Sequence, residues 1–220
     1  IIIPLTAKGA NYSFDSFDYI ARIMVANCAV VVNKDAPWNN LKEFEAAAKK
    51  EPGKLVFASP AATSWLTFAM RNWFTGTGVQ VKQVEYKSGG EAATAVLGGH
   101  ADMTFLFPQN YAPMASADKL KILAIGTKSD VYPNAPTFAE QGYEGNYYGW
   151  QAPKGTPKEI LDRLAGISEE IVKDPEYIKA IKNMNATPDY STGEAWMKQL
   201  KEQYAEMNKV LTDLGLTGNK

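Results

Sequence analysis

One stretch, residues 79–107, constrains the fold of this chain more than any other: VQVKQVEYKSGGEAATAVLGGHADMTFLF. Its first part, residues 79–86, alternates between two sets of side chains and predicts a β-strand. The segment 91–97 is rich in alanine and leucine and predicts a short helix, which two glycines then end. Residues 102–107 form a continuous apolar run, which is typical of a strand covered on both faces.

Strand, short helix and strand in this order form a βαβ unit, whose crossover is expected to be right-handed. Open sheets built from such units bind their ligands at the carboxyl ends of the strands. The sequence therefore places a candidate ligand site near residues 87–88 and 107–110.

The composition restricts the class of protein. A chain of 220 residues can form one large domain or two small ones. With 23 basic and 24 acidic residues, it has no charge excess that would hold nucleic acid or an anionic membrane. Cys28 is the one cysteine, so no internal disulfide can form, and we expect a buried apolar thiol. This fits a cytosolic protein and equally an exported protein without disulfides.

Two further features of the sequence concern membrane spans and the start of the chain. No apolar run approaches the ~20 residues of a membrane span. The chain opens at Ile1, with neither a methionine nor a signal peptide, so we expect a processed or truncated start.

The other regular elements follow from capping signals and apolar spacing. Further strands are expected at 29–32, 55–58, 120–127 and 146–153. Asn40 with Glu43 predicts a capping box. Three helices are expected to close the chain, capped by Thr156, starting at Asp174-Pro175, and starting at Ser191. The predicted inner face of the first closing helix consists of Ile160, Leu164, Ile167 and Ile171.

Hydroxyl groups are concentrated in SPAATS, residues 59–64, between a predicted strand and a predicted helix. The first N–H groups of a helix have no internal partner and carry about half a positive charge. An anion such as a carboxylate satisfies them, and serine or threonine side chains add donors. The alternative is that Thr63 or Ser64 only caps its own helix, which is the more frequent use of such residues.

Nothing in the sequence indicates catalysis. The one histidine, His100, follows two glycines in a predicted turn, and no Cys/His cluster has the spacing of a metal site. No Walker or Rossmann glycine pattern is present. The carboxylates lie mostly at helical spacing from lysines, as on a solvated surface. We therefore expect no enzyme, no cofactor and no metal site.

Several motifs in one register resemble a known family. They are YKSGG at 86–90, LGGHAD at 97–102, PTFAEQGY at 136–143 and APKGTP at 152–157, with PGKL at 52–55 and AS at 58–59 between them. The chain is similar over nearly its whole length to the solute receptors of tripartite tricarboxylate transporters, also called Bug receptors.

This resemblance implies an α/β protein with the periplasmic-binding-protein-like (type II) fold, a two-domain clamshell. Residues 27–126 would form the second lobe, and residues 1–26 and 127–220 the incomplete first lobe. Such a receptor captures a small carboxylate outside the cytoplasmic membrane and delivers it to two membrane subunits of the transporter. We expect an exported monomer that binds no nucleic acid.

The sequence departs from the family pattern in three places. The family's opening strand and its glycine-rich loop are absent, so an N-terminal piece is expected to be missing, and the closing helices should expose apolar stripes. The loop at 59–64 usually has glycines and a histidine soon after, whereas this chain has Pro60 and, at the histidine's position, Thr67. After Phe105 many members carry Asp or Asn, and here Leu106 and Phe107 favour an apolar or aromatic carboxylate over an amino acid.

The hypothesis for the site combines these observations. The residues expected to hold a carboxylate are Ser59, Thr63 and Ser64, and those expected to shape the rest of the cleft are Phe107, Gln109 and Tyr148. Two alternatives remain open: an effector-sensing domain of a regulator with the same clamshell fold, and a small enzyme that would need a strongly perturbed acid–base pair.

Overall fold

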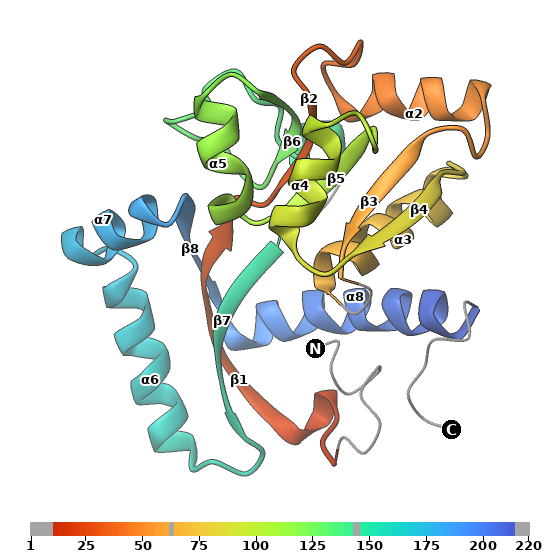
Figure 1. Cartoon of the computed structure of the whole chain (residues 1–220). Helices are drawn as coiled ribbons and strands as arrows, with labels where there is room; N and C mark the ends of the chain where they lie inside the picture. Colours follow the sequence, from red (N-terminus) through yellow and green to blue (C-terminus); the bar gives the residue numbers. More distant parts are fainter. Residues whose placement is uncertain (1–10, 62–63, 143–145, 214–220) are drawn as a thin grey trace. The chain divides into compact units, whose positions relative to one another are not determined.

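A computed structural model describes residues 11–61, 64–142 and 146–213 (Figure 1). The chain divides into two compact units. Unit 1 comprises Ile1–Val25 and Tyr147–Lys220, and unit 2 comprises Ala26–Asn146. Each unit contains its own β-sheet. The mixed α/β class with two units agrees with the fold class expected from the sequence.

Unit 2 is built on a five-stranded sheet in the order β4-β3-β5-β2-β6. Its strands are β2 (Ala29–Asn33), β3 (Val56–Pro60), β4 (Lys82–Tyr86), β5 (Met103–Leu106) and β6 (Leu120–Ile125). Strand β3 runs parallel to both β4 and β5, while β2 is antiparallel to β5 and β6. The two strands of the predicted βαβ unit are present, and β3 separates them within the sheet.

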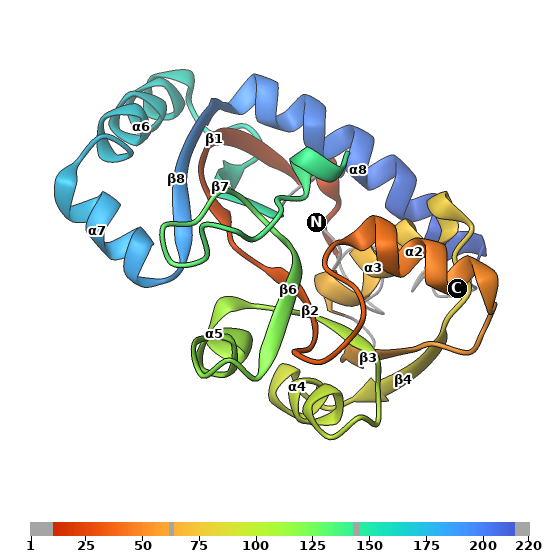
Figure 2. The same ribbon diagram turned by 90° about the horizontal axis from the view of Figure 1, so that it is seen from above.

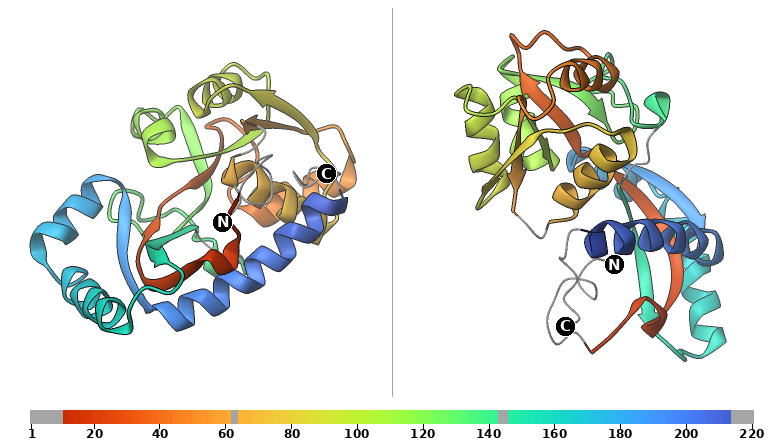
Figure 3. Two further views of the ribbon diagram at one scale, coloured as in Figure 1. Left: turned by 90° about the horizontal axis from the view of Figure 1, so that it is seen from below. Right: turned by 90° about the vertical axis from the view of Figure 1, so that its right-hand side faces the viewer.

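Helices cover both faces of this sheet. They are α2 (Leu41–Lys50), α3 (Trp65–Thr77), α4 (Gly89–Leu97) and α5 (Pro108–Ser116). Because side chains alternate along a strand, Val30 of β2 packs in the cluster that contains α2 and α3, and its neighbour Val31 packs with α4 and α5. Figures 2 and 3 show the resulting three layers of unit 2.

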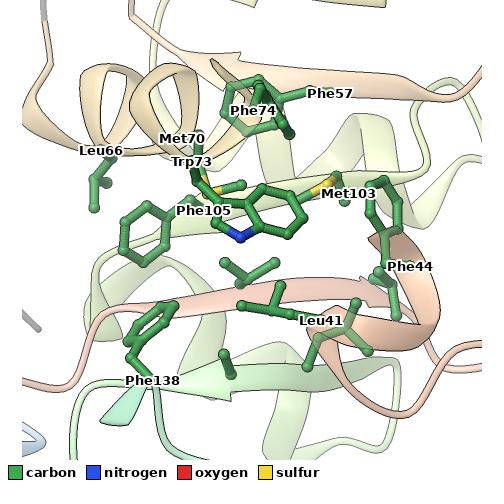
Figure 4. Packing of buried hydrophobic residues seen from close by; sticks show 14 of the residues in the cluster. Leu41, Phe44, Phe57, Leu66, Met70, Trp73, Phe74, Met103, Phe105 and Phe138 are labelled. Atoms are coloured by element: carbon green, nitrogen blue, oxygen red, sulfur yellow. The ribbon is translucent and has the colours of Figure 1, made fainter. Parts of the chain in front are cut away.

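Aromatic side chains fill the layer between the sheet and helices α2 and α3 (Figure 4). The rings of Phe57 and Phe74 meet edge to face at 5.4 Å. The ring of Phe138, which follows β6, meets Phe105 at 5.5 Å in the same way. Thr137 bridges Ile125, so the segment after β6 stays with unit 2. The contact-based boundary therefore falls after Asn146, twenty residues beyond the end of the expected second lobe.

The Asn40 cap and the buried Cys28 are confirmed in unit 2, whereas the second half of the predicted capping box is not. Asn40 caps α2 by accepting a hydrogen bond of 2.9 Å from the Glu43 N–H. The Glu43 carboxylate in turn accepts from the backbone N–H of Asn39, one residue before the cap. Cys28 is buried.

Unit 1 contains a three-stranded sheet in the order β7-β1-β8. Its elements are β1 (Phe17–Ala26), β7 (Asn146–Pro153), β8 (Ala186–Thr192), α6 (Lys158–Ile171), α7 (Pro175–Asn183) and α8 (Gly193–Asp213). Two 3-10 turns complete the described chain, η1 (Phe14–Ser16) in unit 1 and η2 (Ala139–Gln141) in unit 2. No helix among the described residues is both long and apolar enough to cross a membrane.

The helices of unit 1 pack through two small clusters. Leu161 and Ala165 of α6 pack on a cluster that contains Ile23 of β1 and Ala152 of β7. Trp196 of α8 forms a second cluster with Phe14.

Three predictions for unit 1 are wrong. The predicted inner face of α6 is exposed, because the helix packs through Leu161 and Ala165 instead. Thr156 does not cap α6: its hydroxyl donates to the Pro153 carbonyl, and the N-cap position is Pro157. The third closing helix begins at Gly193 rather than Ser191, because the preceding residues form β8.

Candidate ligand-binding site

Three helices of unit 2 begin just beyond the ends of three parallel strands. Strands β3, β4 and β5 end at Pro60, Tyr86 and Leu106, and we call this side of the sheet the carboxyl edge. Helices α3, α4 and α5 begin at Trp65, Gly89 and Pro108. Each helix start carries a partial positive charge, so the carboxyl edge favours anions.

A hydroxyl network holds the loop between β3 and α3. The Thr67 hydroxyl donates to the Ala61 carbonyl at 2.7 Å. It lies 2.8 Å from the Ser59 hydroxyl and 3.2 Å from the Ser64 hydroxyl. Since the Thr67 proton is already committed to Ala61, Thr67 accepts from Ser59, while the longer 3.2 Å contact allows the Ser64 hydroxyl to turn its proton either to Thr67 or to a ligand.

The network gives the two described serines different roles. Ser59 is fully buried, so its hydroxyl is not available at the surface and instead stabilises the loop through its hydrogen bond to Thr67. Ser64 is partly exposed and accepts a hydrogen bond from the Thr67 N–H as the N-cap of α3. Ser64 is therefore the hydroxyl of this pair that lies at the surface of the helix start. Thr63 lies outside the described residues.

Ala61 is the unusual backbone position of this loop, with a φ of +74°. Residues other than glycine rarely adopt this left-handed conformation, which costs roughly 1–2 kcal/mol. The Ala61 carbonyl is held by Thr67, and the Ala61 N–H donates to the Tyr86 carbonyl at 3.0 Å. These bonds maintain the bend although the loop lacks a glycine.

The start of α4 already has its own anion. The Ser88 hydroxyl caps the helix by accepting from the Glu91 N–H. The Glu91 carboxylate accepts from the Lys87 N–H at 3.1 Å. A negative charge therefore already lies in the first turn of α4, whereas the first turns of α3 and α5 contain no acidic residue.

The start of α5 lies close to that of α4. Phe107 occupies the N-cap position of α5 and makes no side-chain capping bond. Asn110 packs against Gly89, where a Cβ atom would lie 2.6 Å from the Asn110 Oδ1. Gln109 is exposed and Phe107 is half-buried. Two of the predicted cleft residues therefore lie at the carboxyl edge, while Tyr148 lies on β7 in unit 1 with its side chain exposed.

Buried polar groups fix the geometry at the ends of β2 and β6. The Tyr111 hydroxyl donates to the Asn27 carbonyl at 2.6 Å, and burial raises the pKa of this phenol far above its ordinary value. The Asn27 side chain accepts from the Thr127 N–H and hydroxyl, both at 2.9 Å. Helix α5 is thereby tied to the beginning of β2, which keeps the carboxyl edge rigid.

The hydrogen bonds of Thr67 and Asn27 could not be predicted from the sequence, because each side chain or carbonyl meets a partner across a helix start or distant along the chain. Thr67 is notable only as the residue at the position of the family's histidine, and Asn27 only as a polar residue within an apolar run. Across the described ranges, no group of three or more His, Cys, Asp or Glu side chains could hold a metal ion. The arrangement is suited to holding an anion by hydrogen bonds.

Comparison with known proteins gives a consistent result. The family described as "Tripartite tricarboxylate transporter family receptor" matches residues 1–216. A UPF0065 protein from the gbd 5' region of Cupriavidus necator is 28% identical over 219 residues, which cover 97% of this chain and 67% of that protein.

Two solved structures show the same fold. A TctC solute binding protein from Polaromonas superimposes with a TM-score of 0.78 at 26% identity, covering 93% of this chain and 72% of that one. The R. palustris protein Rpa4515 with adipate has a TM-score of 0.71 at 21% identity, covering 97% and 74%, and at this identity the likeness concerns the fold alone. The chain thus spans about two thirds to three quarters of the length of these relatives.

Proposed function

The chain belongs to the tripartite tricarboxylate transporter receptor family, and we propose that it captures a small carboxylate outside the cytoplasmic membrane and delivers it to the membrane subunits of such a transporter. The description of the matching family as receptors of tricarboxylate transporters supports a carboxylate as the class of ligand. As in the hypothesis from the sequence, Ser64 would bind the carboxylate, and Phe107 and Gln109 would line the same site.

One observation carries this proposal: the partial positive charge at the start of α3 is not met by an acidic side chain of its own helix. Its first turn contains no acidic residue, whereas α4 supplies Glu91 at the equivalent place. Ser64 provides a hydroxyl at the surface of that helix start, held in position by Thr67. Ser59 would act by supporting Thr67, since it is fully buried. Thr63 and Tyr148 remain candidates from the sequence.

The experiment uses two residues that perform the same N-capping role, Ser64 at the start of α3 and Asn40 at the start of α2. Calorimetry of the natural protein against a panel of di- and tricarboxylates first identifies a ligand. Ser64→Asp preserves the cap of α3, because aspartate is as good an N-cap as serine, yet it places a negative charge where the carboxylate would bind. We expect the affinity to fall by at least ~tenfold, since a like charge at such a site costs more than 1.4 kcal/mol.

Asn40→Asp is the matched control, because Asn40 caps α2 in the same way and lies outside the loops that follow β3, β4 and β5. It should leave the affinity within about twofold. Equal losses in both variants would contradict the assignment of the site to α3. Failure of the natural protein to bind any carboxylate of the panel would contradict the proposed function itself.

A further inference from the structure

A row of three aromatic rings lies beside the carboxyl edge of unit 2. The ring centroids of Trp65, the first residue of α3, and Phe105 on β5 lie 5.8 Å apart, and those of Phe105 and Phe138 lie 5.5 Å apart. Phe105 and Phe138 are only 3% and 6% exposed, and Figure 4 shows both within the core. Trp65 is half-buried and packs against the same cluster. It is therefore the member of this row that reaches the surface.

Trp65 directly follows the residue that would bind the carboxylate. Ser64 is the N-cap of α3 and Trp65 its first helical residue, so the hydroxyl and the indole ring leave the chain at adjacent positions of one helix start. A carboxylate bound by Ser64 would bring its own carbon atoms within reach of the indole ring. Sites for small molecules commonly combine a few polar groups with apolar and aromatic walls in this way.

Phe107 extends the aromatic surface from the neighbouring helix start. It lies two residues beyond Phe105 in extended chain, so both side chains lie on the same face of the sheet. Phe107 is half-buried and packs against the same cluster as Trp65. Leu106, in contrast, is fully buried in the cluster that contains α4 and α5. Of the two residues from which the sequence predicted an apolar ligand, only Phe107 can therefore contact one.

An indole ring at such a site distinguishes an aromatic ligand from a saturated one. Stacked and edge-to-face aromatic pairs gain roughly threefold to tenfold in affinity beyond the burial of their apolar area. A flat ring can lie against the indole while its carboxylate, in the plane of that ring, reaches the helix start. A saturated ring or an open chain buries apolar area there without the gain of an aromatic pair.

We propose that Trp65 is the specificity-determining residue of the carboxyl edge and that it selects a carboxylate that carries an aromatic ring. This inference rests on the proposed function, because it takes the carboxylate to be bound at the start of α3. It concerns the carbon skeleton of the ligand rather than its charge.

Two acids of equal charge and equal ring size test the selection. Benzoate and cyclohexanecarboxylate join the carboxylate panel, and calorimetry measures the affinity of the natural protein for each. Benzoate should bind roughly threefold to tenfold more tightly. Trp65→Leu keeps an apolar side chain and removes the aromatic face, so it should abolish this preference. The affinity for cyclohexanecarboxylate should stay within about threefold.

Trp38 supplies the matched control. It is half-buried and packs against the same cluster, with its ring centroid 4.9 Å from that of Phe44. It follows β2, which runs antiparallel to β5, so it lies beyond the opposite edge of the sheet. Trp38→Leu should therefore leave the preference for benzoate unchanged.

Tryptophan fluorescence reports the contact itself. Benzoate should change the fluorescence of the natural protein and of Trp38→Phe to a similar extent. In Trp65→Phe the change should be lost or strongly reduced. This variant keeps a ring on which benzoate can stack, so calorimetry should still detect binding within about threefold of the natural affinity.

Several results would overturn the inference and leave the proposed function intact. One is equal affinity for the two ring acids, or a preference for benzoate that persists in Trp65→Leu. Another is binding of aliphatic members of the panel while both ring acids fail to bind. Parallel losses in Trp65→Leu and Trp38→Leu would mean that Trp65 acts only through the core. If no carboxylate of the panel binds, the proposed function fails together with this inference.

Discussion

The two units of this protein differ in how completely they bury their own apolar residues. Unit 2 covers both faces of a five-stranded sheet with helices and contains the large aromatic core. Of the nine exposed large apolar side chains among the described residues, eight lie in unit 1 and only Val131 lies in unit 2. Unit 2 therefore accounts for its own stability, whereas unit 1 has apolar surface that its own elements leave uncovered. The candidate site lies on unit 2, whose buried core and hydrogen bonds hold the carboxyl edge in place.

The largest expected effect tests this contrast directly. Phe44→Ala removes a fully buried ring from the unit 2 core and should destabilise that unit by about 3–5 kcal/mol. Leu164→Ala removes an exposed apolar side chain from α6 and should change the stability of the 220-residue chain by less than about 0.5 kcal/mol. Urea denaturation of both variants measures the difference. Similar losses would show that the two units bury their apolar residues equally well.

A second prediction examines where unit 1 is tightly packed. Gly193 begins α8 against the backbone of β1, and a Cβ atom there would overlap the Tyr19 carbonyl. Because a backbone atom cannot move aside as a flexible side chain can, Gly193→Ala should destabilise unit 1 by about 1–3 kcal/mol. Hydrogen exchange resolved by segment should show faster exchange in β1 and α8, with β2 and β5 unchanged. An unchanged unit 1 would mean that the contact between α8 and β1 is loose.

A third prediction concerns the rigidity of the carboxyl edge. Tyr111→Phe removes the hydrogen bond to the Asn27 carbonyl and should cost about 1–2 kcal/mol. Tyr132→Phe is the control, since the Tyr132 hydroxyl makes only a long 3.4 Å contact with Ala112. It should cost less than about 0.5 kcal/mol.

The same substitution changes the pH dependence of stability. The pKa of Tyr111 is raised above its ordinary value of 10.0, mainly by burial and to a smaller extent by the neighbouring Tyr132. The folded protein therefore holds the Tyr111 proton more tightly than the unfolded chain does. The stability that protonated Tyr111 contributes is complete below about pH 10 and is lost as the pH rises further. Tyr111→Phe should reduce the loss of stability between about pH 9 and 11. The part that remains should come from unit 1, where burial raises the pKa of Tyr19 to about 12.

Much of unit 2 could be predicted from the sequence because its signals are local. The run of consecutive valines in β2 and the Asn40 cap of α2 are signals that involve only residues a few positions apart. The position of β3 between β4 and β5 could not be predicted in this way, because strand order depends on contacts distant along the chain.

Unit 1 was harder to predict because its signals are ambiguous. Strand β8 has the sequence ATPDYST, and its Pro188 and Asp189 are residue types that are rare in strands, so the sequence does not predict a strand there. Helix α6 has two apolar rows, and spacing alone cannot tell which of them faces the sheet. For the candidate site, the capping role of Ser64 could be predicted, but the complete burial of Ser59 depends on Thr67 beyond the loop.

The prediction with the smallest expected effect concerns the stability of helix α6. Gly166 lies in the middle of this helix, and no atom lies within 4 Å of the place that a Cβ would take. Gly166→Ala should therefore stabilise the 220-residue chain by about 0.5–1 kcal/mol, because alanine loses less backbone entropy in a helix than glycine. This corresponds to a rise in melting temperature of about 1–4 °C in a calorimetric scan. If the substitution destabilised the chain instead, α6 would have to be closely packed at Gly166, and the difference between the two units would narrow accordingly.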